Sequence, residues 1–143
     1  NNDMIDIKRF KHSNKKLMRK AFDIRKEVFV VEQNVDPKEE YEFEEESIHF
    51  ILFANSTACA TARYRRTKEG IKLERFAVIK LKRGKGYGLL ILKAILEDLQ
   101  ENVELKYLHA QVQVVPFYEK VGFKKRGELF EEAGIMHYKM IIP

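Results

Sequence analysis

The sequence has little of several features that define whole classes of proteins. Its 143 residues include one cysteine, Cys59, so the chain cannot form an internal disulfide, and a lone cysteine does not make a zinc site; we expect no metal. The 7 glycines and 3 prolines are too few for a collagen-like or loop-dominated chain. No apolar run approaches the roughly 18 residues that a membrane span requires. Charges occupy residues 1–10, where a signal peptide would be apolar, so we expect a cytoplasmic protein with no membrane partner.

What is present indicates one folded domain. Hydrophobic residues make up 45% of the chain, with 10 Phe and 6 Tyr, which is enough for a sizeable core and excludes a disordered tail although 34% of the residues are charged. The length, and the lack of any repeat or linker, predict a single domain over residues 1–143. The net charge of +5 favours an anionic partner, without choosing among nucleic acid, a membrane surface and a phosphorylated small molecule.

Hydrophobic periodicity predicts a mixed fold. Polar and apolar residues alternate over 4–10, which indicates a strand, and apolar residues then recur at helical spacing from 17 to 28, after a cap at Ser13 or Asn14. Further strands are predicted over 48–54, 58–65, 71–79, 107–114, 123–130 and 135–142, with a long helix over 86–100 and a short one between Pro116 and Gly122. This order predicts an α/β or α+β domain with one strand–helix–strand crossover.

A cluster of glycines marks the most informative segment. Gly84, Gly86 and Gly88 fall within five residues, between a predicted strand and the long helix. Glycine lets the backbone approach a ligand closely, and the first amide groups of a helix have no partner within it and lie at its positive end. Arg83 and Lys85 add full positive charges. The segment therefore predicts a phosphate or pyrophosphate site, and the alternative is a tight turn with solvated charges.

Two common nucleotide sites do not fit this segment. A nucleoside-triphosphate loop ends in Gly-Lys-Ser or Gly-Lys-Thr, which is missing here. A dinucleotide site has the spacing G-x-G-x-x-G, whereas these glycines are spaced G-x-G-x-G. That site also needs an acidic residue at the end of the next strand, and Glu104 precedes the strand.

The segment resembles a known family signature. Arg83-x-x-Gly86-x-Gly88, which opens a helix after a strand, is similar to the acetyl-coenzyme A pyrophosphate signature of the GNAT superfamily of N-acetyltransferases. Residues 74–78 resemble the family's strand that meets the pantetheine arm, and residues 116–123 resemble its C-terminal FYxxxGF segment. Residues 28–33, 110–111 and 134–137 also resemble a branch of small bacterial GNAT proteins whose acceptor is poorly defined. The likeness covers nearly the whole chain.

The resemblance implies a fold and an activity. It implies a GNAT-like fold with a central mixed sheet of about seven strands flanked by helices, and a possible homodimer. It also implies direct transfer of an acetyl group, in a ternary complex, from acetyl-coenzyme A to a primary amine of a small molecule or peptide. The implied cofactor-binding residues are Phe76, Ala77, Val78, Arg83, Gly84, Lys85, Gly86, Tyr87, Gly88, Gln111, Phe117 and Tyr118.

The resemblance also implies catalytic roles. The family's strand, with its bulge, supplies a backbone donor that corresponds here to Val78. Tyr118 corresponds to the family's tyrosine acid, which protonates the departing thiolate, and its alternative role is that of a core aromatic beside Phe117 and Phe123. Many members carry an asparagine shortly before this tyrosine, and this chain has glutamines at 111 and 113 instead.

The base and the acceptor contacts rest on weaker patterns. An attacking amine must first lose a proton, and Glu74 on the central strand is the candidate that relays it through water, the alternative being a salt bridge to a neighbouring strand. Glu32 and His49 are further candidates for the base and for contacts at the acceptor site, and a strand histidine is more often a satisfied core residue. The same holds for His137, and Cys59 is expected to be merely buried.

Arginines and an acidic run complete the set of charged candidates. Arg25 and Arg63 are candidates for binding an acceptor carboxylate, against the commoner role of paired surface charges. The acidic run over 39–46 is predicted to be a solvated face, with attraction of a cationic amine as the alternative.

Two other functions compete with acetyl transfer. One is a catalytically idle sensor that binds acetyl-coenzyme A without turnover. The other is a nucleic-acid-binding module that uses the basic residues of 8–20 and 80–85. The acidic run and the lack of spaced exposed aromatics disfavour the second, so we expect acetyl-coenzyme A and an amine as partners, and no nucleic acid.

Overall fold

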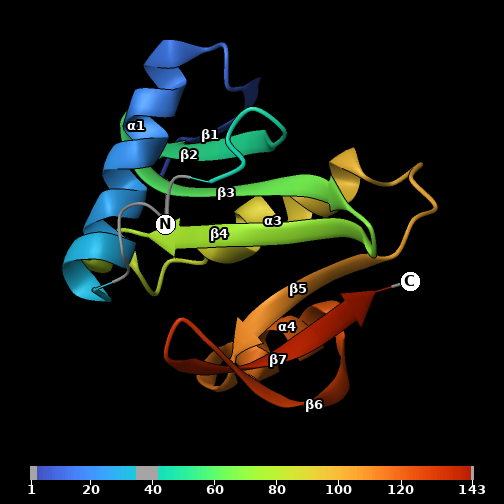
Figure 1. The fold of residues 1–143 in the computed structure, drawn as a ribbon. Coiled ribbons are helices and arrows are strands. Elements are labelled where there is room, and N and C mark those ends of the chain that lie inside the picture. Colours follow the sequence, from blue (N-terminus) through green and yellow to red (C-terminus); the bar gives the residue numbers. More distant parts are fainter. Residues whose placement is uncertain (1–2, 35–41, 143) are drawn as a thin grey trace. The chain divides into compact units, whose positions relative to one another are not determined.

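The structure, a computed structural model, describes residues 3–34 and 42–142 (Figure 1). Its strands are β1 (Ile5–Lys11), β2 (Ile48–Ala54), β3 (Thr57–Thr67), β4 (Gly70–Val78), β5 (Lys106–Gln111), β6 (Lys124–Glu132) and β7 (Ile135–Ile142). Its helices are α1 (Lys15–Arg25), α3 (Tyr87–Asp98) and α4 (Val115–Val121), with a π-helical segment η1 (Lys26–Glu32) and the short 3-10 turns η2 (Lys80–Lys82) and η3 (Val112–Val114). Among the helices of this described part, none is both long and apolar enough to cross a membrane.

The strands form one mixed sheet in the order β1-β2-β3-β4-β5-β7-β6. Strand β5 runs parallel to β4, and α3 supplies the crossover between them, whereas β1 with β2, β2 with β3, β5 with β7 and β6 with β7 are antiparallel. The predicted element order and the mixed sheet of about seven strands flanked by helices are therefore confirmed.

The chain forms two compact units, and the chain crosses between them within β3, within β4 and after α3. The N-terminal unit consists of Asn1–Arg65 and Arg75–Glu101. The C-terminal unit consists of Arg66–Glu74 and Asn102–Pro143. The N-terminal unit therefore contains the glycine-rich segment, and the C-terminal unit contains Tyr118.

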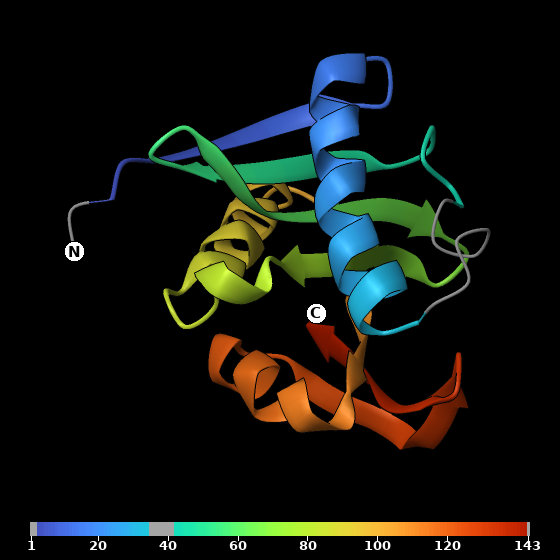
Figure 2. The same cartoon turned by 90° about the vertical axis from the view of Figure 1, so that its left-hand side faces the viewer.

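The core of the N-terminal unit packs helix α1 against the sheet. Asn14 caps this helix, since its side-chain oxygen accepts a hydrogen bond from the amide of Leu17 at 3.1 Å, as the sequence predicts. The helical spacing of the apolar residues then directs them at β1, β2 and the end of β4, in a cluster of Phe10, Met18, Ala21, Ile24, Val28, Ile51 and Ala77. Helix α3 lies on the other face of β1–β3 (Figures 1 and 2).

The C-terminal unit is built on the β6–β7 hairpin. Ala133 and Gly134 turn the chain with φ of 52° and 76°, and β7 pairs with β5 as far as Gln111 opposite His137. Strand β5 is shorter than the predicted 107–114, because residues 112–114 form a 3-10 turn that leads into α4. Pro116 lies in the first turn of α4, and Gly122 ends it with φ of 113°.

We predict that Gly70→Ala destabilises the protein. Gly70 has φ of 143°, and a Cβ atom there would lie 2.2 Å from the carbonyl oxygen of Leu105, which accepts a hydrogen bond from the amide of Ile71. Both backbone strain and overlap with fixed backbone oppose the substitution, so we expect a loss of about 3 kcal/mol in the free energy of unfolding.

Gly127→Ala is the matched control, measured in the same urea titrations. Its φ is 81°, but a Cβ atom would meet nothing within 4 Å, so strain alone applies and about 1 kcal/mol is expected. Equal losses in the two variants would contradict the steric explanation.

Candidate functional site

The glycine-rich segment joins the end of β4 to the start of α3. Gly84 and Gly86 have φ of 80° and 82°, a conformation that residues with a side chain rarely adopt. A Cβ atom on either would meet nothing within 4 Å, so the backbone here faces open space. Gly88 is different, because its Cβ would lie 3.7 Å from the side chain of Val78, where the helix packs on the strand. The segment thus combines a helix N-terminus with room for a ligand beside it.

Arg83 is held in place by two partners from its own unit. Its Nε donates to the carbonyl of Val78 at 3.0 Å, and its two terminal nitrogens donate to the two carboxylate oxygens of Glu32 at 2.8 and 2.7 Å. This pairing lowers the pKa of the Glu32 carboxyl, which weakens it as a base. The sequence predicts that Arg83 binds the cofactor and that Glu32 belongs to the acceptor site, whereas in the structure the two side chains form an ion pair with each other.

The side chain of Tyr87 anchors the beginning of the chain. Its hydroxyl donates to Asp3 at 2.6 Å, and this hydrogen bond raises the pKa of Tyr87 to about 12. The ring is buried. The hydroxyl of this predicted cofactor-binding residue is therefore engaged within the protein, which leaves its backbone as the part near the loop.

The predicted pantetheine strand, residues 74–78, contains a backbone irregularity within β4. Arg75 has φ of 58°, unusual for a residue with a side chain, so the strand bends immediately before Phe76. Ala77 is buried in the core under α1, and the carbonyl of Val78 accepts the hydrogen bond from Arg83. The resemblance implies a bulge in this strand, and that bulge stays a prediction.

Tyr118 lies in the C-terminal unit, on α4. Its ring makes edge-on contacts with Phe117 and Phe123, at centroid distances of 5.1 and 5.8 Å, and only 8% of the residue is exposed. Burial raises the pKa of Tyr118 far above that of an ordinary phenol, so the hydroxyl keeps its proton at any physiological pH. Tyr118 is therefore a core aromatic that also carries a permanent hydrogen-bond donor.

Glu74 and Gln111 each have a close polar neighbour in the same unit. The carboxylate of Glu74 lies 3.6 Å from Nζ of Lys72, two positions earlier on β4, so at least one ion pair of Glu74 lies within its own strand. The side-chain oxygen of Gln111 accepts a hydrogen bond from Gln113 at 2.8 Å, which ties together the two glutamines at the end of β5.

Three predicted acceptor-site residues gather around one buried carboxylate. Arg25 donates both terminal nitrogens to Glu44, at 3.0 and 2.6 Å, and a terminal nitrogen of Arg63 lies 3.0 Å from the same carboxylate. Nε2 of His49 lies 3.0 Å from the backbone carbonyl of Glu44, and its ring stacks on Phe10. Arg25, His49 and Arg63 are each only 1% exposed.

This cluster corrects two expectations. The commoner role of paired charges, weighed against an acceptor carboxylate, is what the structure shows for Arg25 and Arg63, but their partner Glu44 is buried and not at the surface. Burial lowers the pKa of His49, so the imidazole is neutral while it is hydrogen-bonded to the backbone carbonyl of Glu44. The prediction of a solvated acidic face is wrong at Glu44, which is buried, and holds at 42, 45 and 46, which are exposed; residues 39–41 lie outside the described part.

Comparison with known proteins settles the family. The model of the GNAT acetyltransferase domain matches residues 10–143. The chain belongs to the GNAT family of acetyltransferases. It is 39% identical over 132 residues to YjcF, an uncharacterized N-acetyltransferase of Bacillus subtilis, covering 90% of this chain and 94% of that one. Membership supports acyl transfer from a coenzyme A donor.

Solved structures agree with this GNAT fold. Escherichia coli ElaA superposes with a TM-score of 0.85 at 27% identity, over 96% of this chain and 99% of that one. An aminoglycoside 6'-N-acetyltransferase solved with coenzyme A has the same fold, with a TM-score of 0.77 at 16% identity over 96% and 98% of the two chains.

The sequence gives no signal for one further group of side chains in this GNAT chain. His109, His137 and Glu132 meet in the C-terminal unit, although His109 and Glu132 are 23 residues apart. Within residues 3–34 and 42–142, no group of three or more His, Cys, Asp or Glu side chains is arranged to hold a metal ion.

We predict that Glu44→Gln destabilises the protein by about 3 kcal/mol at pH 7, because it removes the anion from a buried cluster of cationic arginines. The arginines lower the pKa of Glu44 below its ordinary 4.5, so its ionic contribution is present above that value and is lost as the pH falls through the folded pKa. Urea titrations at pH 7 and in acid measure both effects.

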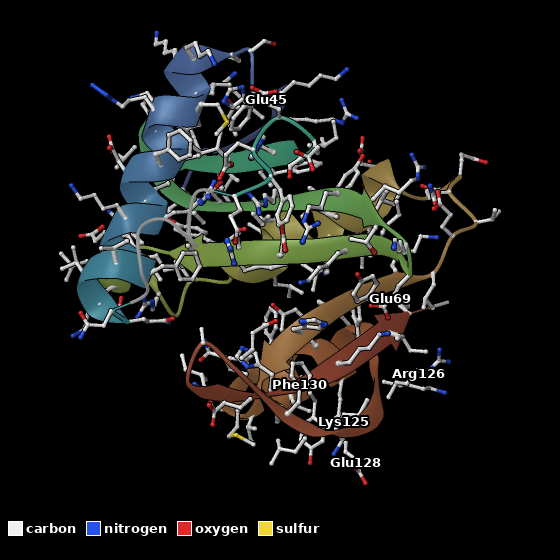
Figure 3. The ribbon with its side chains drawn as sticks, viewed as in Figure 1. Glu45, Glu69, Lys125, Arg126, Glu128 and Phe130 are labelled. Atoms are coloured by element: carbon white, nitrogen blue, oxygen red, sulfur yellow. The ribbon has the colours of Figure 1, made fainter. Side chains whose placement is uncertain are left out.

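Glu45→Gln is the matched control, since Glu45 is the exposed neighbour labelled in Figure 3. We expect a change within about 0.5 kcal/mol. An equal loss in both variants, or an acid dependence that Glu44→Gln leaves unchanged, would rule out the ionic role of Glu44.

Proposed function

We propose that the chain transfers the acetyl group of acetyl-coenzyme A to a primary amine of a small molecule or peptide. Membership in the GNAT family supports the transfer of an acyl group from a coenzyme A donor. The single observation that carries the finer proposal is the open backbone of Gly84 and Gly86, both at positive φ, immediately before α3.

The diphosphate of the donor is the group that this loop suits. A helix of 12 residues begins at Tyr87, and its first amide groups and positive end favour an anion. Lys85 adds a charge in the loop, and Arg83 braces the loop through Val78 while it shares its own charge with Glu32. A protein of the same fold, the aminoglycoside N-acetyltransferase, was solved in complex with coenzyme A, which supports the assignment.

The proposed reaction needs two groups from the protein: a hydrogen-bond donor to the thioester oxygen and an acid that protonates the departing sulfur. Bound acetyl-coenzyme A supplies an activated acyl carbon. We assign the backbone amide of Val78 as the donor to the thioester oxygen, because the residue ends β4 next to the glycine loop and its carbonyl is fixed by Arg83. We assign Tyr118 as the group that protonates the departing thiolate, because burial raises its pKa and the hydroxyl is therefore protonated at neutral pH, although the same shift makes it a weaker acid than an ordinary phenol.

The candidates for the base differ in how well they suit the task. Glu32 is a weak base because its pKa is lowered by Arg83, and His49 is buried and bonded to Glu44. Glu74 stays a candidate, with its carboxylate beside Lys72. Phe76, Ala77, Gln111 and Phe117 are assigned to contacts with the donor.

We predict that Gly86→Asp abolishes the stabilisation of the protein by coenzyme A. Coenzyme A at 100 times its dissociation constant adds about 2.7 kcal/mol to stability, and we expect a rise in Tm of about 5 °C or more for the unmutated chain. An aspartate at Gly86 brings a negative charge and a Cβ into the open space of the loop, so that rise disappears.

Gly127→Asp is the control, because Gly127 also has positive φ and open space but lies on β6. It is expected to keep the full rise in a thermal-shift measurement. A Gly86→Asp protein that coenzyme A still stabilises would reject the loop as the diphosphate site.

We predict that Tyr118→Phe lowers kcat about 100-fold and leaves KM for acetyl-coenzyme A within about twofold, since it removes only the proton donor. Thiol release with a panel of primary amines measures both constants, and coenzyme A binding by the variant shows that it is folded. An unchanged kcat would leave Tyr118 with a packing role alone. Binding by the unmutated chain without transfer to any amine would favour the idle sensor.

A further inference from the structure

The β5–β7–β6 part of the sheet brings four side chains to one face. The strand register pairs His137 with both Gln111 of β5 and Phe130 of β6, and it pairs Glu132 with Ile135. Side chains two apart on a strand share a face, so His109, His137, Phe130 and Glu132 lie together (Phe130 is labelled in Figure 3). The proposed acetyl transfer assigns no role to any of these four residues.

The hydrogen bonds fix which atoms carry protons. Nδ1 of His109 lies 3.1 Å from Oε2 of Glu132, and this bond lowers the pKa of the Glu132 carboxyl, so the carboxylate is ionised and only accepts. Nδ1 of His137 lies 2.7 Å from the carbonyl of Ile135, which also only accepts. In its neutral form His137 therefore carries its proton on Nδ1 and keeps a lone pair on Nε2.

Two acceptor atoms consequently face each other. Nε2 of His137 lies 4.0 Å from Oε1 of Glu132, and while the imidazole is neutral neither of these two atoms offers a proton. A nitrogen about 2.8 Å from each would fit between them and donate one hydrogen to each, as an ammonium group can. The ring centroid of Phe130 lies 5.8 Å from that of His137 and 5.0 Å from that of His109. Phe130 therefore places an aromatic ring, which attracts cations, beside the two histidines.

The nearby cations of the chain are engaged with other carboxylates. Lys72 pairs with Glu74, and Lys139 pairs with Glu69 while it lies over the ring of Tyr107. In the part of the chain that the structure describes, Glu132 pairs only with the two histidines. Glu132 is also half-exposed, with 46% of its side chain accessible, so a ligand can reach it.

We propose that Glu132 and His137 bind the ammonium group of the acceptor and that Nε2 of His137 removes its first proton. The acceptor is then a primary amine that arrives positively charged. His109 is a positioning residue, because it acts by orienting the Glu132 carboxylate. The assignment rests on the proposed acetyl transfer, and Glu74 is the competing proton acceptor.

Every proton in the proposed transfer step is accounted for. The ammonium nitrogen gives one proton to His137, whose imidazolium pairs with Glu132 and later releases that proton to water. The neutral nitrogen forms the C–N bond to the acyl carbon while the C–S bond breaks. The nitrogen then gives up its second proton, which replaces the proton that Tyr118 donates to sulfur. The charged and titratable groups around His137 are Glu132 on β6, His109 on β5, Lys139 on β7, Lys72 on β4 and Glu69 before β4.

The test compares variants in acetyl transfer to benzylamine, tyramine and spermidine between pH 6 and 9. We expect His137→Asn to lower kcat/KM about 100-fold and to remove the acidic limb of its pH profile. Glu132→Gln is expected to raise KM for the amine about tenfold and to leave KM for acetyl-coenzyme A unchanged. His109→Asn is expected to raise KM for the amine in the same direction by a smaller factor.

Matched controls separate this site from general charge effects. Glu128→Gln changes an exposed carboxylate on the same strand (Figure 3), and His12→Asn changes a histidine between β1 and α1; both are expected to behave as the unmutated chain. Thermal stabilisation by coenzyme A shows that each variant is folded.

Two results overturn the assignment, and they are distinguishable. An unchanged pH profile in His137→Asn, with the limb lost in Glu74→Gln instead, would transfer the base to Glu74 and leave the proposed function intact. An unmutated chain that binds coenzyme A and acetylates none of the three amines would overturn the proposed transfer, and this assignment with it.

Discussion

The turn between β4 and α3 depends on a backbone that only glycine adopts readily. Gly84 and Gly86 hold positive φ with open space beside them, and this is what lets the chain pass from a strand into a helix whose first amides face outward. Arg83 locks the turn to both the carbonyl of Val78 and the carboxylate of Glu32. A side chain at either glycine would strain the turn and fill the space that the proposed diphosphate needs.

Most of the charges that look available in the sequence are already paired inside the protein. Arg25 and Arg63 hold Glu44, and Arg83 holds Glu32. A charge that leaves water needs an opposite charge close by, so a buried arginine implies an internal carboxylate before it implies a ligand. The proposed substrate contacts therefore use the backbone amides and Lys85 of the glycine loop and the half-exposed carboxylate of Glu132.

The environments of the ionisable groups suit them to opposite tasks. Arginine neighbours lower the pKa values of Glu32 and Glu44, and His109 lowers that of Glu132, so these carboxylates attract cations and accept hydrogen bonds. Tyr87 and Tyr118 both have raised pKa values, from a hydrogen bond to Asp3 in one and from burial in the other. The hydroxyl of Tyr87 donates to Asp3, so the proposed acid role is assigned to Tyr118 and not to Tyr87.

The order of the elements, a cap at Ser13 or Asn14, the turns and the glycine loop follow from the sequence alone, because each depends on residues a few positions apart. Only the tertiary structure decided the ion pairs, since 19 residues separate Arg25 from Glu44 and 51 separate Glu32 from Arg83. The early end of β5 and the positive φ of Arg75 also appear only in the structure, because the local hydrophobic pattern indicates neither of them. Periodicity records which face of an element is apolar, whereas a charge finds its partner only when distant strands and helices pack.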